Sequence, residues 1–346
     1  MQLVEETGRI MDPQLAADAA GLRYVTADAR GIARKRAGTG FSYADAGGKT
    51  IRDRAVLDRI HKLAIPPAWT QVWICPQANG HLQATGLDAR GRKQYRYNDE
   101  FRALRETAKF EHILVFAQAL PTIRERIAKD MARHGVPREK VLATVVHLLE
   151  TTLVRVGNKD YAKANGSYGL TTLRDAHVDV TGGTLHFHFK GKSGKAWNLK
   201  ISDRRVANIV RACQELPGQQ VFEYLDADGA VQGVDSAEVN AYLKEITGRE
   251  ITAKDFRTWF GTVAAAVALH ERGALPLKKT ARAVIGEVAA RLGNTPAICR
   301  KCYIHPEILV AYEGGELALR LRGNGRKFAL SAEEAAVYRF LVGRLN

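Results

Sequence analysis

The sequence is short of acidic residues. Its 346 residues contain 37 Asp and Glu against 52 Lys and Arg, which gives a net charge of +15 at pH 7. A positive excess of this size attracts polyanions through its long-range field and through counterion release. We therefore expect nucleic acid as the partner.

Long hydrophobic runs are also missing. No apolar stretch approaches the roughly 20 residues that a membrane-spanning helix needs, and the first residues lack the basic-then-apolar pattern of a secretory signal. We therefore expect a cytoplasmic protein that does not bind membranes.

Cysteine is scarce, with four in the chain. Without secretory features, these cysteines are expected to be reduced thiols. Cys299 and Cys302 form a C-x-x-C pair, but no second pair completes a zinc site. The sequence thus gives no metal site, and structural packing is the favoured role of this pair.

A nucleotide-binding loop is incomplete as well. Gly191-Lys192-Ser193 has the order found at the end of such a loop, but His186 stands where the loop needs a glycine. We expect no ATP site and no other small-molecule cofactor.

What is present indicates an α+β protein of two domains. Hydrophobic residues make up 46% of the chain, enough for a sizeable core. Short alternating segments and glycine turns predict a β-rich domain over residues 1–105, and helical periodicity predicts a mostly helical domain over 106–346. Alternation returns between His177 and Ile201, which predicts a small antiparallel sheet there.

Several elements are expected at defined places. We predict a strand at Leu22–Val25 and a solvated basic segment at Arg30, Arg34, Lys35 and Arg36, which in so basic a protein tracks DNA phosphates. Pro121 is expected to separate two helices, 108–120 and 122–133. The next helix is expected to start after Pro137 and to end at Gly157-Asn158, with Arg155 in its last turn.

The stretch from Gly293 to Tyr303 is the most informative. Gly293 has the position of a glycine that ends a helix, and Thr295-Pro296 reads as the N-cap and first residue of the next helix. Tyr303 is expected on about the second turn of that helix. A tyrosine with a pKa near 10 attacks phosphate only if cations stabilise the phenolate and the transition state.

Five residues supply a suitable set for such an attack: Arg155, Lys192, Arg257, Asn294 and Tyr303. Two guanidiniums and an amide can hold non-bridging phosphate oxygens, and a lysine can donate a proton to the leaving oxygen. Taken singly, each has an ordinary alternative role on a surface, in a loop or in the core.

In order and spacing these residues resemble the type IB DNA topoisomerases, most closely their small poxvirus-like and bacterial members. The motifs of the catalytic half are Val154-Arg155-Val156-Gly157, Phe189-Lys190-Gly191-Lys192, Lys254-Asp255-Phe256-Arg257-Thr258-Trp259, and Gly293-Asn294-Thr295-Pro296 with Tyr303. Those of the β-rich half are Ile65-Pro66-Pro67-Ala68-Trp69 and Gly91-Arg92-Lys93-Gln94-Tyr95-Arg96-Tyr97. The resemblance covers nearly the whole chain.

The resemblance implies a monomeric clamp, associated with the bacterial nucleoid, that relaxes supercoiled double-stranded DNA without ATP or metal. Tyr303 is implied to form a 3′-phosphotyrosyl intermediate, which religation reverses. Arg155, Arg257 and Asn294 are implied to hold the phosphate oxygens, and Lys192, alone or with Arg155, to donate the proton. The implied DNA contacts are Lys93, Gln94, Tyr95, Tyr97, Lys159 and Tyr161.

The sequence departs from the family at Asn294, where histidine is usual. An amide can donate a hydrogen bond but cannot carry a charge or exchange a proton. We therefore assign Asn294 a binding role and expect slower cleavage than in an Asn294→His variant.

Two alternatives remain open at this point. A tyrosine site-specific recombinase uses nearly the same set, although it typically has histidine where this chain has Lys254. A non-catalytic DNA-binding protein would explain the charge and leave Tyr303 in the core.

Overall fold

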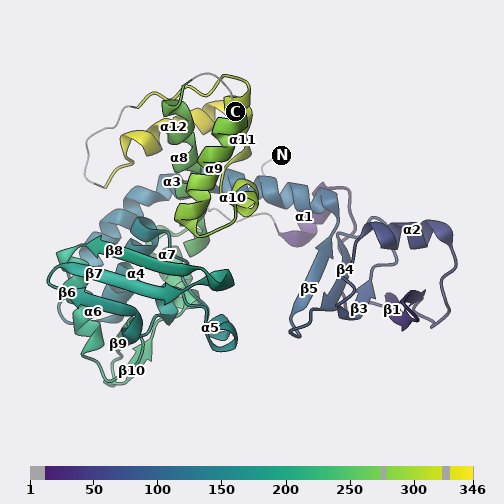
Figure 1. Cartoon of the computed structure of the whole chain (residues 1–346), viewed down its shortest axis with the longest axis horizontal. Coiled ribbons are helices and arrows are strands. Elements are labelled where there is room, and N and C mark those ends of the chain that lie inside the picture. The colour runs from purple at the N-terminus through teal and green to yellow at the C-terminus, as the bar shows by residue number, and fades with distance from the viewer. Residues whose placement is uncertain (1–11, 274–277, 322–327, 346) are drawn as a thin grey trace. The chain divides into compact units, whose positions relative to one another are not determined.

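The computed structural model describes residues 12–273, 278–321 and 328–345. The chain divides into two compact units, the first ending at Glu111 and the second beginning at His112. Figure 1 shows that strands dominate the first unit, whereas the second combines helices with small sheets. This α+β architecture confirms the predicted fold class.

The first unit is built on a five-stranded antiparallel sheet of order β2-β1-β3-β4-β5. Helix α2 packs Ile60 and its neighbours against buried strand residues such as Ile74. Asp53 caps this helix by accepting hydrogen bonds from the amides of Ala55 and Val56. The elements are α1 (Pro13–Ala19), β1 (Ile32–Ala37), β2 (Gly40–Ala44), α2 (Arg54–Lys62), β3 (Thr70–Ile74), β4 (Leu82–Leu87) and β5 (Lys93–Tyr97).

The predicted strand at Leu22–Val25 is wrong, because only a single bridge joins Arg23 to Gly80. The basic segment forms β1 instead, paired with β2 and β3. Arg34 donates hydrogen bonds to the carbonyls of Pro66 (3.0 Å) and Trp69 (2.6 Å) and to that of Ile65. Its guanidinium thus fills an inward position that hydrophobic alternation assigns to an apolar side chain. To make the predicted phosphate contact, Arg34 would have to leave these carbonyls.

The predicted break at Pro121 is also wrong. One helix, α3 (Asp99–Asp130), runs through this proline and spans both units. The expected boundary at residue 105 lies inside it. A proline inside a helix costs about 3 kcal/mol. The flanking residues Phe116, Leu120 and Ile123 are fully buried in one core, and that burial outweighs the lost hydrogen bond.

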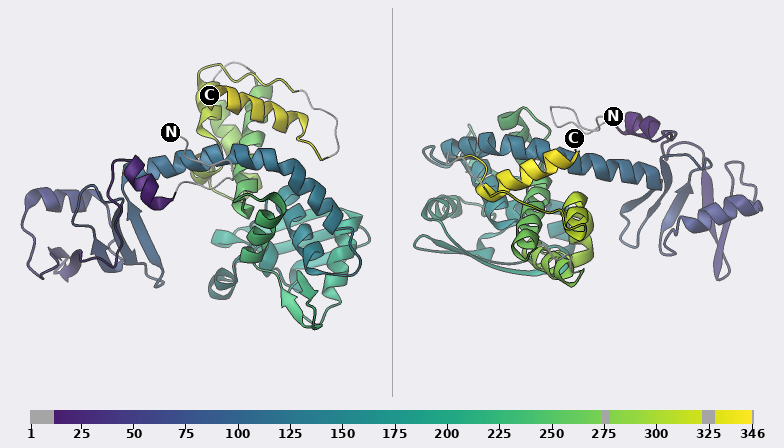
Figure 2. Two further views of the ribbon diagram at one scale, coloured as in Figure 1. Left: turned by 180° about the vertical axis from the view of Figure 1, so that it is seen from behind. Right: turned by 90° about the horizontal axis from the view of Figure 1, so that it is seen from above.

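The second unit has a helical group and a three-stranded antiparallel sheet of order β6-β7-β8 (Figure 2). Helix α8 packs against α4, α7, α9, α11 and α12, which makes it the central helix. The strands are β6 (Val178–Thr181), β7 (Thr184–Lys190), β8 (Ala196–Ser202), β9 (Glu223–Leu225) and β10 (Val231–Gly233). The helices are α4 (Arg138–Thr152), α5 (Lys159–Asn165), α6 (Arg204–Gln214), α7 (Ser236–Thr247), α8 (Ala253–Glu271), α9 (Lys278–Leu292), α10 (Pro296–Cys302), α11 (Pro306–Glu313) and α12 (Ala332–Leu345), with short 3₁₀ turns η1 (Leu170–Thr172), η2 (Asp175–His177) and η3 (Lys192–Gly194).

The predicted sheet between His177 and Ile201 is confirmed by β6, β7 and β8.

No helix among the described residues is long and apolar enough to cross a membrane.

Candidate active site

Arg155 lies on a loop rather than on a helix. Helix α4 ends at Thr152 and Leu153 adopts a left-handed conformation with φ of 58°, so the predicted extension of this helix to Gly157 is wrong. Leu153 and Val154 are buried in the same core as the helix, which is why the apolar pattern continues past the helix end. The amide of Leu170 donates to the Arg155 carbonyl at 2.9 Å and fixes the loop.

Two glycines allow this loop to pack closely against the next segment. A Cβ on Gly169 would lie 2.6 Å from the Arg155 carbonyl oxygen and from backbone atoms of Gly157. Gly157 has φ of +108°, a conformation that favours glycine. Gly157, two residues after Arg155, therefore helps to set the position from which the guanidinium extends.

Arg257, near the start of α8, links this helix to the loop after α4 and to the end of α9. Its side chain is 3% exposed and donates one hydrogen bond to the carbonyl of Leu153 and another, of 2.6 Å, to that of Leu292. Its guanidinium carbon lies 5.0 Å from the centre of the Tyr303 ring. Burial, and then the adjacent positive charge of Arg155, lower the pKa of Arg257 to about 10.

The turn between α9 and α10 has the predicted caps. Gly293 has φ of +64°, and the Thr295 side chain accepts from the amide of Ile298 with Pro296 at the first helical position. Asn294, held between these caps, accepts a hydrogen bond from Arg155 Nη2 through its amide oxygen.

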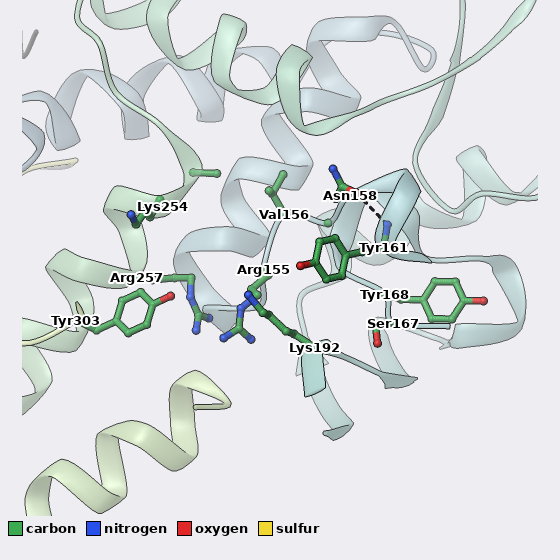
Figure 3. A pocket seen from close by; sticks show the side chains of 12 residues that line it. Arg155, Val156, Asn158, Tyr161, Ser167, Tyr168, Lys192, Lys254, Arg257 and Tyr303 are labelled. Carbon is green, nitrogen blue, oxygen red and sulfur yellow. Dashed lines mark hydrogen bonds between the residues drawn. The ribbon is translucent and has the colours of Figure 1, made fainter. Parts of the chain in front are cut away.

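Tyr303 is the C-cap of α10, with φ of −134°. The prediction that it lies on about the second helical turn is off by a single residue, because α10 ends at Cys302. Its backbone is held against α8, where Thr262 Oγ1 donates to its carbonyl at 3.3 Å. A Cβ on Gly261 would be 2.7 Å from the same carbonyl oxygen. The close approach turns the phenol toward Arg257, as Figure 3 shows.

Lys192 lies in η3, between β7 and β8, as the sequence predicted. Its ammonium lies 5.9 Å from the centre of the Tyr161 ring, and Figure 3 shows it extending toward Arg155. The neighbouring Lys195 donates to the Ala290 carbonyl at 2.9 Å. This hydrogen bond ties the lysine-bearing connection to α9.

These residues surround a pocket of about 290 Å³. Its walls include four cations and no acidic residue: Arg155, Lys192, Lys254 and Arg257. Tyr303 lines the same pocket, whereas Asn294 reaches it only through Arg155. Four close cations without a carboxylate repel one another, so the pocket favours an anion with several oxygens.

Two buried donors in this part of the chain reinforce that conclusion. Asn294 Nδ2 and Arg257 Nε are buried and have no hydrogen-bond partner among the described residues. A buried donor without an acceptor costs free energy. Phosphate oxygens would supply the acceptors that both nitrogens need.

The six predicted DNA-contact residues fall on two elements. On β5, Lys93, Tyr95 and Tyr97 are exposed, and the two tyrosine rings stack with centroids 6.0 Å apart. Gln94 points to the other face of this strand and donates to Asp88 at 3.0 Å. In the second unit, Lys159 opens α5, and Tyr161 on the same short helix lines the pocket.

Sequence reasoning missed part of the pocket wall. Asn158, Ser167, Tyr168 and Lys254 also line it, and helix α5 was not predicted. Asn158 caps that helix by accepting from the amide of Tyr161 at 2.9 Å. An N-cap asparagine two residues before an acidic residue was the available signal.

The C-x-x-C pair has a packing role. Cys299 is buried and Cys302 half-buried, and neither forms a disulfide. Burial raises the pKa of Cys299 to about 11, which keeps the thiol protonated and unreactive at neutral pH. Among the residues with a described position, no group of three or more His, Cys, Asp or Glu could hold a metal ion.

Two family models match the chain. One is described as the catalytic core of eukaryotic DNA topoisomerase I and matches residues 98–314. The other is described as the N-terminal domain of bacterial DNA topoisomerase IB and matches residues 40–88. Between them they cover most of both units.

The chain is also similar to curated viral proteins. It is 32% identical over 294 residues to DNA topoisomerase 1B of Acanthamoeba polyphaga mimivirus, an alignment covering 82% of this chain and 88% of that protein. It is 24% identical over 278 residues to DNA topoisomerase 1B of Vaccinia virus (strain Copenhagen), covering 74% of this chain and 82% of that protein. Over 289 residues it is 24% identical to DNA topoisomerase 1 of Rabbit fibroma virus (strain Kasza), covering 78% and 88%.

Proposed function

The chain belongs to the type IB DNA topoisomerases, and from that premise we propose that it relaxes supercoiled DNA with Tyr303 as the nucleophile. The phenol oxygen attacks a backbone phosphorus, the bond from phosphorus to the 5′ oxygen breaks, and a 3′-phosphotyrosyl ester forms. The free 5′-hydroxyl strand then rotates, and its attack on the same phosphorus releases Tyr303. Bond energy is conserved, so the cycle consumes no ATP.

The cations have separate tasks in this proposal. Arg155 and Arg257 hold the non-bridging oxygens, whose charge grows in the transition state. Asn294 donates to one of those oxygens through Nδ2, since its carbonyl oxygen is occupied by Arg155. Lys192 gives a proton to the leaving 5′ oxygen, the phenol proton of Tyr303 passes to solvent, and religation reverses both transfers. Residues in this chain thus supply the proton donor and the positive charges of the step, without a metal.

The observation that supports this mechanism best is the packing of Tyr303 beside the Arg257 guanidinium, in an acid-free pocket that Arg155 also lines. An architectural DNA-binding protein has no need of a phenol among unneutralised cations. A core role for Tyr303 does not explain the buried, unpartnered donors around it.

We propose further that a monomer acts as a clamp that contacts duplex DNA through both of its units, in the cytoplasm and in association with the nucleoid. Exposed Lys93, Tyr95 and Tyr97 of β5 support a DNA-facing role for the first unit, and Lys159 and Tyr161 support one for the second. Gln94 would have to leave Asp88 to join them.

The decisive experiment is incubation with a labelled duplex followed by denaturing electrophoresis. The wild type is expected to form a covalent adduct that Tyr303→Phe does not form, because the substitution removes only the attacking oxygen. An adduct that persists in Tyr303→Phe, or none in the wild type, would refute the mechanism. Relaxation of a plasmid without a recombination site separates it from a recombinase, which would join specific sites instead.

A further inference from the structure

The first unit has a second pocket, which takes no part in the proposed cleavage chemistry but shares Tyr97 with the proposed DNA-facing side of β5. It has a volume of about 400 Å³ and lies among α1, the residue before β4, β5 and the beginning of α3. This volume is within the range of small-ligand sites. Its lining combines aromatic rings with cations: Pro13, Tyr24, His81, Tyr97, Phe101, Arg102, Arg105, Glu106 and Lys109.

The aromatic side of the pocket is a stack of rings. Tyr24 lies parallel to His81, with ring centroids 4.5 Å apart and an interplanar angle of 8°. His81 meets Phe101 edge to face at 4.8 Å. Tyr24 and Tyr97 remain 40% and 42% exposed, an unusual state for rings that could pack inward. Solvated π faces of this kind are platforms for planar ligands.

The rings are held rigidly from behind. His81 is 5% exposed, and its Nδ1 accepts from the amide of Val25 at 3.1 Å. Burial lowers the pKa of His81, so the ring is neutral and stacks as an uncharged plane. Phe101 is packed into the small core that joins α1 to α3. The platform is therefore preorganised before a ligand arrives.

The cationic side lies along one face of α3. Arg102, Arg105 and Lys109 follow at spacings of three and four residues, which puts them in a row on the helix. The row extends about 10 Å along the helix axis, longer than one phosphate group. Arg102 also pairs with Asp99 at 2.9 Å on the surface, a contact of little strength. Glu106 is the single acid among the lining residues, so the pocket has a net positive charge.

We propose that this pocket binds an unstacked nucleobase of a single-stranded DNA segment, with the flanking phosphates held by Arg102, Arg105 and Lys109. A base inside a duplex has both faces covered by its neighbours and cannot stack on Tyr24, whereas an unpaired base can. The length of the cationic row favours a strand over a mononucleotide. Local duplex opening in underwound DNA would supply the strand, and to that extent the inference rests on the proposed function.

The test compares two strands with the same phosphates. The full-length protein is titrated, at fixed salt, into fluorescently labelled oligothymidylate about 12 nucleotides long, or into an abasic strand of equal length. The wild type is expected to bind the oligothymidylate about tenfold more tightly, the order of one base–aromatic stack. Tyr24→Ala is expected to abolish most of that ratio, and Tyr24→Phe, which keeps the ring, to retain it.

The cations are tested with a charge-matched pair of variants. Arg105→Gln is expected to weaken the binding of both strands by a similar factor and to reduce the salt dependence. Arg54→Gln removes the same charge from an exposed position of α2 outside the pocket and is expected to weaken binding less. Equal effects of the two variants would overturn the assignment of the phosphates to α3.

Two results would overturn the base-binding site itself. One is a wild type that binds the abasic strand as tightly as oligothymidylate, and the other is a Tyr24→Ala variant that keeps the wild-type ratio. A strand containing 2-aminopurine provides a check without any variant, because stacking on a tyrosine quenches its fluorescence. Adduct formation on duplex DNA is measured separately, so a protein that discriminates bases but forms no adduct would refute the cleavage mechanism alone.

Discussion

The amide oxygen of Asn294 accepts a hydrogen bond from Nη2 of Arg155, two residues that lie far apart in the sequence. The contact determines the orientation of the amide, because it leaves Nδ2 as the group that can donate to a phosphate. Nδ2 is buried and has no partner among the described residues. Asn294 thus holds Arg155 through its amide oxygen and presents Nδ2 as a hydrogen-bond donor to the phosphate.

Replacing Asn294 tests both tasks. Asn294→Ala is expected to slow cleavage about 100-fold, the usual cost of one oxyanion donor. Asn294→His is expected to cleave about tenfold faster than the wild type below pH 6.5, where imidazolium gives a charged hydrogen bond. The rate of that variant should fall as pH rises through about 6.5. Single-turnover adduct formation on labelled duplex measures these rates.

Asn294→Asp serves as the control for charge. Its carboxylate can still accept from Arg155 but repels the phosphate, so it should cleave more slowly than Asn294→Ala. A histidine variant no faster than the wild type at any pH would contradict the binding role assigned to the amide.

Trp197 is expected to position the proton donor. A Cβ on Gly191 would lie 2.6 Å from the Trp197 indole nitrogen, and a Cβ on Gly293 would lie 2.6 Å from the neighbouring ring carbon Cζ2. The indole therefore contacts both the residue before Lys192 and the residue before Asn294. Trp197→Ala should free the connection between β7 and β8 that holds Lys192. Cleavage should slow about 100-fold, within the usual range for a lost general acid.

A substrate with sulfur in place of the 5′ oxygen distinguishes positioning from general damage. A thiolate leaves without a proton, since the pKa of a thiol is near 8.5. This substrate should restore most of the rate of Trp197→Ala and of Lys192→Ala, but not that of Arg257→Ala. Failure to restore the Trp197→Ala rate would mean that the tryptophan supports the site in another way.

Local chemistry explains which parts of the site were predictable. Gly293, Thr295 and Pro296 have strong individual preferences for a helix end and a helix start, so the turn holding Asn294 could be located from the sequence. The hairpin holding Lys192 follows from alternation and glycine turns. Each of these elements depends on neighbours within a few residues.

The remaining parts depend on tertiary contacts. The apolar pattern predicts a helix at Arg155 because Leu153 and Val154 continue it, although these two residues are buried from a loop. Strand β1 could not be predicted because Arg34 stands at an inward position where alternation expects an apolar residue. Its guanidinium donates to carbonyls that are distant in the sequence. The hydrogen bond from Arg155 to Asn294 leaves no local signal at either residue, so it could not be predicted.

Two helical glycines provide a matched pair for testing the position of Tyr303. Gly261→Ala puts a Cβ 2.7 Å from the Tyr303 carbonyl oxygen, whereas Gly286 in α9 has open space around it. We expect Gly261→Ala to displace Tyr303 and reduce adduct formation at least tenfold. Gly286→Ala should leave cleavage unchanged and stabilise the protein by up to about 1 kcal/mol. Thermal unfolding and adduct assays on both variants check this, and equal activities would argue against the close approach at Gly261 as a determinant of the site.

His305 makes stability depend on pH near the nucleophile. Its side chain is 4% exposed, its Nδ1 accepts from the amide of Glu307, and burial lowers its pKa to about 4. An unfolded chain takes up a proton near pH 6.5, whereas the folded protein resists protonation down to about pH 4. The stabilisation is therefore complete above pH 6.5 and is lost as pH falls toward 4.

Between pH 7 and pH 5 this difference amounts to about 2 kcal/mol of unfolding free energy. His305→Asn keeps an oxygen that can accept from Glu307 but does not titrate, so its stability should fall by about 2 kcal/mol less over the same interval. His134→Asn, at an exposed position, is the control. It should leave the difference in unfolding free energy between pH 7 and pH 5 nearly unchanged. Urea unfolding at the two pH values, followed by a probe in the second unit, measures the effect. If His305→Asn loses as much stability as the wild type, the acid sensitivity arises from other groups and His305 is protonated in the folded protein without cost.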